Sequence, residues 1–193
     1  MRRLFLLLCT VSLAVACSEP PHKELDRAQG ALDAARAAGA EQYAAESFTA
    51  ATGALAEAHE AVNQRDYRLA LSLAVDASER AQGAAKEAAE VRATILGERE
   101  RAIASTTSAL KELHSQIAAA QAARVPAPEL EAAEAVSDDT AAALQEARTL
   151  LGQEDYAAAG KRLEGRTDEI REQIALLEEA VKARGAPPAR RRR

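Results

Sequence analysis

Two cysteines and three histidines are the side chains of this sequence best suited to covalent or metal chemistry. His22, His59 and His114 have no second histidine or cysteine at the spacing of a metal site, so we expect them to be exposed residues on helices. The serines are dispersed without a nearby base, and no glycine-rich phosphate loop or nucleophile elbow is present. The sequence therefore predicts neither an enzyme nor a bound metal or cofactor.

Cys17 is the position at which the sequence points to a definite reaction. Residues 1–16 contain two arginines and then an apolar run, which is the layout of a secretory signal. The run is shorter than the roughly 20 residues that a membrane-spanning helix needs. The sequence from Leu13 to Cys17 resembles the lipobox of bacterial lipoproteins, with Ala14 where the strongest form of that motif has leucine. We expect cleavage before Cys17 and acylation of its thiol, and the alternative is ordinary cleavage that leaves a free thiol.

The mature chain would keep one cysteine, because Cys9 lies in the segment that is removed. A lone cysteine in an exported chain calls for an explanation, and acylation provides one. Several acyl chains, each contributing about 0.8 kcal/mol per buried CH₂, would make the attachment of a tether at residues 17–23 effectively permanent. Ser18 stands where lipoproteins of the inner membrane often carry aspartate. By resemblance to that sorting rule, we expect the periplasmic face of the outer membrane.

The charges divide into an acidic body and a basic end. The sequence has 25 basic and 30 acidic residues, and removal of 1–16 leaves 23 against 30, a balance of −7. An acidic, exported chain argues against a nucleic acid partner. Four positive charges stand together at Arg190, Arg191, Arg192 and Arg193. We expect 185–193 to be a disordered basic tail. One function open to its arginines is the binding of anionic lipid headgroups or lipopolysaccharide phosphates, at about 1 kcal/mol per residue. The alternative is a solubilising end.

The rest of the chain predicts an all-α fold, an antiparallel helical bundle or coiled coil with long helices. Alanine is the most abundant residue and has the highest helix propensity, while tryptophan is absent. Apolar residues recur with the alternating spacing of three and four that defines a coiled-coil seam. The longest run is Ala70, Ala74, Ala77, Ala81, Ala84, Ala88, Val91 and Ile95. Because most seam residues are alanine, we expect closely packed helices.

The seam is interrupted at two places, and a last helix follows the second interruption. The seam slips by one residue between Ile95 and Ile103, and Gly97 lies in the gap, which fits either a continuous helix or a hinge. Pro126 predicts a break between helices. Beyond it, a last helix is expected from Tyr156 to the glycine and prolines that begin at Gly185. Its apolar positions are Tyr156, Leu163, Ile170, Ile174, Leu177 and Val181.

An internal duplication relates the two halves. Residues Ala54–Tyr67 match Ala143–Tyr156 at a shift of 89, and Glu41–Glu46 matches Glu129–Glu134 at a shift of 88. Both halves read as helix, short loop, helix, Gln-x-Asp-Tyr turn and helix. The chain is therefore expected to contain two copies of a three-helix unit.

The two copies are assigned to residues 24–97 and 98–184. The turn between the second and third helix of each copy has the same two residue types, an aspartate followed by a tyrosine. They are Asp66, Tyr67, Asp155 and Tyr156. Each aspartate is placed to cap the following helix, at about 1 kcal/mol. Each tyrosine is expected to pack over its turn, with ligand stacking as the alternative.

Three short motifs in the first copy carry a family resemblance: Ala44-Ala45-Glu46, Leu55-Ala56-Glu57-Ala58 and Asp66-Tyr67-Arg68-Leu69-Ala70. Residues 24–92, which contain them, resemble the alanine-rich lipoprotein domain called domain of unknown function 4398. The stretch after Asp66 is also similar to the second helix of tetratricopeptide repeats, although the tryptophan and final proline of that repeat are missing. The resemblance implies an envelope location and a helical architecture.

The leading functional hypothesis is a membrane-anchored envelope lipoprotein that acts as a structural or protein-interaction scaffold. The segment from Asp66 to Ala123, at 1.5 Å per residue, would reach roughly 85 Å if it is one helix. The alternatives are a periplasmic chaperone or carrier, which would need exposed apolar surface, and an adaptor that regulates a cell-wall enzyme. An envelope protein partner is expected, and its identity does not follow from these residues.

Overall fold

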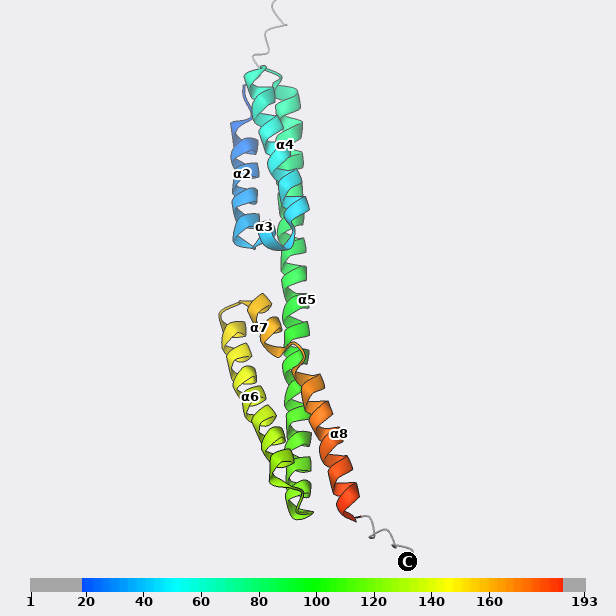
Figure 1. The fold of residues 1–193 in the computed structure, drawn as a ribbon. Helices are drawn as coiled ribbons and strands as arrows, with labels where there is room; N and C mark the ends of the chain where they lie inside the picture. Colours follow the sequence, from blue (N-terminus) through cyan, green and yellow to red (C-terminus); the bar gives the residue numbers. More distant parts are fainter. Residues whose placement is uncertain (1–18, 186–193) are drawn as a thin grey trace, which may run out of the picture. The chain divides into compact units, whose positions relative to one another are not determined.

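The computed structural model describes residues 19–185, and every regular element within that range is an α-helix (Figure 1). This confirms the all-α class. The helices are α2 (His22–Ala37), α3 (Ala40–Tyr43), α4 (Ala45–Asn63), α5 (Tyr67–Ala122), α6 (Ala127–Gly152), α7 (Tyr156–Leu163) and α8 (Arg166–Gly185).

The chain divides into two compact units between Arg92 and Ala93, five residues before the boundary assigned from the sequence. Helix α5 contributes its N-terminal part to the first unit and its C-terminal part to the second. The helix is continuous through Gly97, which decides between the two interpretations of the slipped seam. A glycine inside a helix costs up to about 1 kcal/mol relative to alanine, and that cost is too small to break a helix of 56 residues.

The first unit packs α2, α4 and the N-terminal part of α5 around a core made largely of alanine. The seam predicted from the sequence forms the α5 side of this core. Its buried residues are Ala74, Ala77, Ala81, Ala84 and Ala88 from α5, with Leu25, Leu32, Phe48 and Leu55 from the other two helices. The chain turns between α2 and α3 at Gly39, whose φ of 84° favours glycine and where a Cβ would meet the Tyr43 ring at 3.1 Å.

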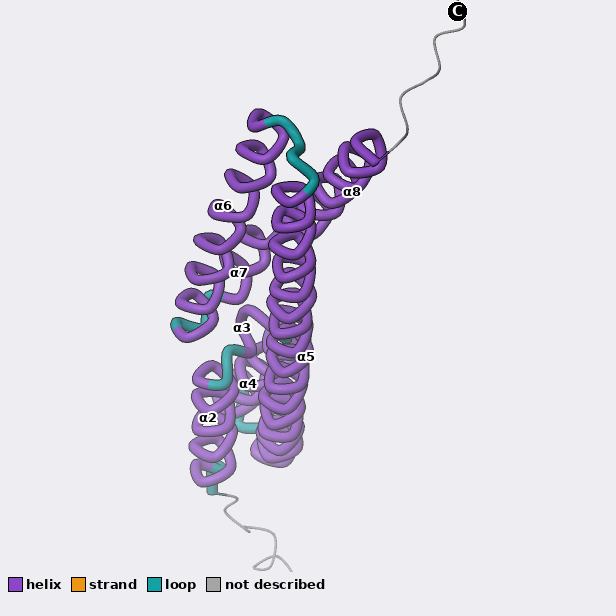
Figure 2. Tube along the Cα trace, turned by 90° about the horizontal axis from the view of Figure 1, so that it is seen from below, coloured by secondary structure: helices purple, strands orange, loops and turns teal. Residues whose placement is uncertain are grey.

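The second unit packs α6, α7 and α8 with the C-terminal part of α5, and short loops separate these helices (Figure 2). Its core uses larger side chains than the first, among them Leu110, Leu113, Ile117, Leu144, Ile170 and Leu177. It also contains polar groups. Thr106, Ser137 and Thr140 are all buried in this unit.

The two Gln-x-Asp-Tyr turns have the same backbone geometry. The residue before each aspartate is left-handed, with φ of 63° at Arg65 and 61° at Glu154. The backbone N–H groups of Asp66 and Asp155 donate to the carbonyl oxygens five residues back, at 2.9 and 3.0 Å. These bonds close the preceding helix in the Schellman manner, so the duplication seen in the sequence extends to the turns.

The buried faces of α4 and α6 also correspond, at a constant shift of 89 residues. The matching buried pairs are Ala44 and Ala133, Phe48 and Ser137, Ala51 and Thr140, Leu55 and Leu144, and Ala58 and Ala147. The sequence match of Glu41–Glu46 to Glu129–Glu134, at a shift of 88, is therefore one residue out of register with the packing. The reason is local, because the chain breaks at Ala44 between α3 and α4, whereas α6 has no break there.

The prediction of one last helix from Tyr156 onward was wrong, because the chain forms two helices, α7 and α8. The break lies at Glu164, which is extended with ψ of 129°, and at Gly165, whose φ is 75°. Leu163 and Ile170, on either side of the break, are both buried and seven residues apart. The apolar spacing therefore continues across a turn that only the glycine marks.

Candidate functional site

The two chemical features predicted at the ends of the chain lie outside the described residues. They are the lipidation site Cys17 and the basic residues Arg190, Arg191, Arg192 and Arg193. The described chain starts at Glu19, and α2 begins at His22, so the last two residues of the predicted tether at 17–23 are helical. Within residues 19–185, none of the helices combines the length and apolar character needed to cross a bilayer.

Both aspartates of the duplicated turns cap the helix that follows. The Asp66 Oδ1 atom accepts a hydrogen bond from the Leu69 backbone N–H at 3.0 Å. The Asp155 Oδ1 atom accepts one from the Ala158 backbone N–H, also at 3.0 Å. Each bond satisfies a backbone donor that the first turn of a helix leaves without an intrahelical partner.

The two tyrosines that follow these aspartates differ in burial. Tyr156 is 8% exposed, and its carbonyl oxygen accepts a hydrogen bond from Arg99 Nε at 3.1 Å. Tyr67 is half-buried. The Arg99 side chain crosses Gly160, where an added Cβ would come within 2.8 Å of the guanidinium carbon. Arg99 thus joins α5 to α7 within the second unit.

The histidines do not gather into a common site in the described chain. His22 and His59 are exposed on different helices. The Nε2 atom of His114 lies 2.7 Å from the Ser137 hydroxyl, which links α5 to α6. Across residues 19–185, no three histidine, cysteine, aspartate or glutamate side chains lie close enough together to hold a metal ion.

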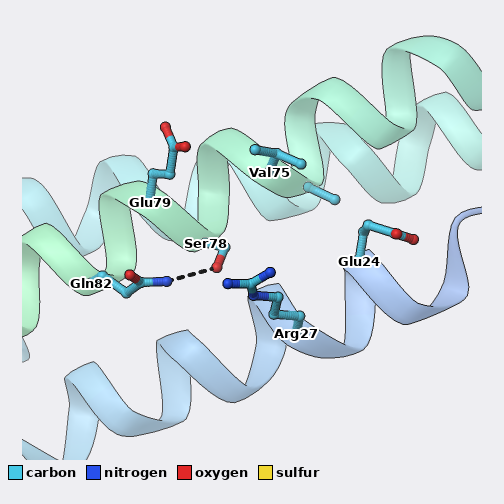
Figure 3. A pocket seen from close by; sticks show the side chains of 7 residues that line it. Glu24, Arg27, Val75, Ser78, Glu79 and Gln82 are labelled. Atoms are coloured by element: carbon cyan, nitrogen blue, oxygen red, sulfur yellow. Dashed lines mark hydrogen bonds between the residues drawn. The ribbon is translucent and has the colours of Figure 1, made fainter.

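One hollow of the first unit lies between α2 and α5, and we call it the α2/α5 groove (Figure 3). It has a volume of about 190 Å³ and is lined by Glu24, Arg27, Val75, Ser78, Glu79 and Gln82. Figure 3 shows Arg27 extending from α2 toward Ser78 of α5, whose hydroxyl accepts a hydrogen bond from Gln82 at 3.2 Å. The wall is therefore part apolar and part charged.

Two large apolar side chains are exposed in this groove and in the hollow beside it. Val75 is 44% exposed and lines the groove itself. Leu71, which is 42% exposed, lies one helical turn before it and lines the adjoining hollow beside Glu24. The sequence analysis missed both residues because it followed the alanine seam. The available signal was a pair of large apolar residues at positions outside that seam.

The pKa values that depart from their ordinary range belong to surface groups. A hydrogen bond and the charge of Glu41 raise the pKa of Arg36, whose guanidinium also lies 5.4 Å from the centre of the Phe48 ring. Hydrogen bonds from Gln64 and then Asn63 lower the pKa of Glu60. Each of these contacts fastens a helix end or a turn, so the shifts reflect local structure.

Comparison with protein-family models, curated proteins and solved structures gives no match to this chain. The resemblance to domain of unknown function 4398 stays a prediction from the sequence.

Proposed function

We propose that this chain is an exported lipoprotein, held through acylated Cys17 at the periplasmic face of the outer membrane, and that its helical units form a scaffold for another envelope protein. The signal-like segment before Cys17 supports the export and the anchor. The helices of the described chain support a structural role, since both turn aspartates cap the helix that follows and the alanine-rich core of the first unit packs its helices closely.

The observation that carries the interaction role is the exposed apolar pair Leu71 and Val75, of which Val75 lines the α2/α5 groove and Leu71 lines the adjoining hollow. Complete burial of a leucine or valine contributes about 1.5 to 3 kcal/mol, so burial of the remaining exposed part of each would contribute roughly 1 kcal/mol. Apolar residues one turn apart, with a charged rim, suit a partner helix that presents its own apolar stripe.

The charged rim gives this surface a preference for its partner. Glu24 lies on the α2 wall of the groove and Glu79 on the α5 wall. Arg27 also lies on the α2 wall, one helical turn after Glu24. A partner helix with a basic residue beside its apolar stripe would complement the two carboxylates. The partner class is thus an amphipathic helical segment of an envelope protein.

Site-specific photocrosslinking in cells tests this proposal, with a benzophenone amino acid at Val75 and a matched control at Leu69. Leu69 is a suitable control because it lies on the same helix and is 47% exposed, yet it does not line the groove. We expect a discrete crosslinked product from position 75, lost when Leu71 is replaced by aspartate, and little product from position 69. Equal products from both positions would contradict the proposal.

The identity of the crosslinked product separates the scaffold from its alternatives. One or a few folded envelope proteins would support the scaffold. A ladder of unfolded outer-membrane proteins would instead support a chaperone or carrier, and a cell-wall enzyme would make the chain an adaptor for that enzyme.

A further inference from the structure

A second hollow lies entirely within the second unit, between the start of α6 and the end of α8. We call it the α6/α8 groove, and it has a volume of about 540 Å³. Its principal lining residues are Glu129, Ala132, Leu176, Glu179, Ala180 and Ala183. Leu176 is 54% exposed, more than any other large apolar side chain reported for residues 19–185. An apolar floor is therefore left uncovered by the helices that the structure describes.

Two carboxylates flank this floor, Glu129 from α6 and Glu179 from α8. Neither forms an ion pair or a side-chain hydrogen bond with another residue of the described range. Nearby carboxylates do have partners, since Glu178 pairs with Lys182 at 4.0 Å and Glu134 accepts a hydrogen bond from Gln121 at 3.1 Å. The groove thus combines an exposed leucine with two negative charges that no described cation compensates.

The surrounding unit is acidic as well. Residues 93–185 contain 17 acidic and 11 basic side chains, a balance of −6. The eight residues that follow, 186–193, contain no acidic side chain and four arginines. Opposite charges in segments joined directly along the chain attract strongly, because the tail cannot diffuse away.

The position and length of this tail match the groove. The tail starts after Gly185, only two residues beyond Ala183 on the groove wall. From Ala183 back to Gln173 the groove follows about 15 Å of helix, at 1.5 Å per residue. Eight residues in a polyproline conformation extend about 25 Å, so the tail is long enough to turn back at Gly185 and cover the groove.

The composition of the tail matches the chemistry of the groove. Pro187 and Pro188 come first and offer apolar rings for the exposed side of Leu176. Proline-rich segments bind apolar grooves with little loss of conformational entropy, because they are already extended. The arginines come last and can form charge-assisted hydrogen bonds with carboxylates such as Glu179 and Glu129.

We infer that residues 186–193 fold back within the same molecule and occupy the α6/α8 groove, with the prolines on Leu176 and the arginines at Glu129 and Glu179. This inference is independent of the anchor at Cys17 and of the scaffold surface in the first unit. It gives the basic tail an internal partner, and it means that an anionic membrane must displace the tail from the groove before it can bind the arginines.

Disulfide trapping tests the inference in the mature chain, residues 17–193, with Cys17→Ser so that only introduced cysteines are present. The test pair is Ala132→Cys with Ala189→Cys, which keeps all four arginines. The matched control is Ala127→Cys with Ala189→Cys, because Ala127 is exposed on the same helix but does not line the groove. We expect the intramolecular disulfide of the test pair to form several-fold faster than that of the control.

Two further arms test the chemistry of the contact. At 1 M salt, where the screening length is about 3 Å, and in a variant with Glu129→Gln and Glu179→Gln, the rates of the test and control pairs should converge. Rates that differ by less than about two-fold in the unmodified groove at low salt would overturn the inference. A test pair that forms only intermolecular dimers would also overturn it, and would assign the groove to a second copy of the chain.

Discussion

Replacing Thr140 with valine is expected to stabilise the second unit by about 1 to 2 kcal/mol. The Thr140 side chain is 0% exposed, and its Oγ1 atom has no hydrogen-bond partner in the structure of residues 19–185. A buried hydroxyl without a partner costs about 1 to 3 kcal/mol. Valine has nearly the same shape and no hydroxyl, so it removes this cost without leaving a cavity. The corresponding position in the first unit is Ala51, which is also fully buried and carries no polar group.

Urea unfolding followed by circular dichroism measures this effect. With a slope of about 1 to 3 kcal/mol per M, a stabilisation of that size raises the midpoint by roughly 0.3 to 2 M. Hydrogen exchange over α6 should slow in parallel, which locates the change in the second unit.

Thr106→Val is the matched control because it should change stability in the opposite direction. Thr106 is 1% exposed, and its hydroxyl shares a hydrogen bond of 3.0 Å with the Thr167 hydroxyl. The variant leaves Thr167 without that partner and should destabilise the unit by about 1 kcal/mol. A Thr140→Val variant that is less stable than the natural chain would refute the reasoning.

Three further predictions concern the duplicated turns. Arg65→Gly should stabilise the chain by about 0.5 to 1 kcal/mol in urea unfolding, because glycine adopts the left-handed φ without strain, and Arg65→Ala should show no such gain. Asp155→Ala should destabilise the second unit by about 1 kcal/mol, whereas Asp155→Asn should retain most of the stability, and equal losses would contradict a capping role. The lowered pKa of Glu60 implies a contribution to the stability of the folded chain. This contribution is fully present above the pKa that Glu60 has in the unfolded chain, and it is lost as pH falls through the lower pKa of the folded chain. NMR titration should show the pKa of Glu60 rising in Gln64→Ala, and an unchanged value would contradict the assigned cause.

The helical fold follows from the sequence because the pattern that predicts it is repeated many times. Each alanine from Ala70 to Ala88 on the seam is buried, and a three-four spacing sustained over that length has few interpretations other than a packed helix. The seam weakens where the first unit ends, and Val91 and Ile95 are only half-buried.

The features that were missed depend on single residues. The break between α7 and α8 rests on Gly165, and the spacing from Leu163 to Ile170 conceals it. Gly97, in contrast, looks equally disruptive in sequence and stays helical. Glycine permits a left-handed turn without requiring one. The packing on either side therefore decides whether the helix breaks at a glycine, and this packing cannot be read from the sequence.

The candidate surfaces were hidden for a related reason. Leu71, Val75 and Leu176 are ordinary apolar residues on amphipathic helices, and their exposure depends on which neighbouring helix covers them. The turn aspartates were easier to find, because a cap needs only local geometry. The lipidation predicted at Cys17 rests on a motif of its own, and that residue lies outside the described residues.

The intact mass of the protein extracted from membranes tests the central claim most directly, with Cys17→Ser as the control. The account predicts a mass equal to residues 17–193 plus attached acyl chains, and a control protein that is neither acylated nor cleaved before position 17. A soluble chain with an unmodified cysteine would contradict the account, and would leave a freely diffusing helical protein in place of an anchored scaffold.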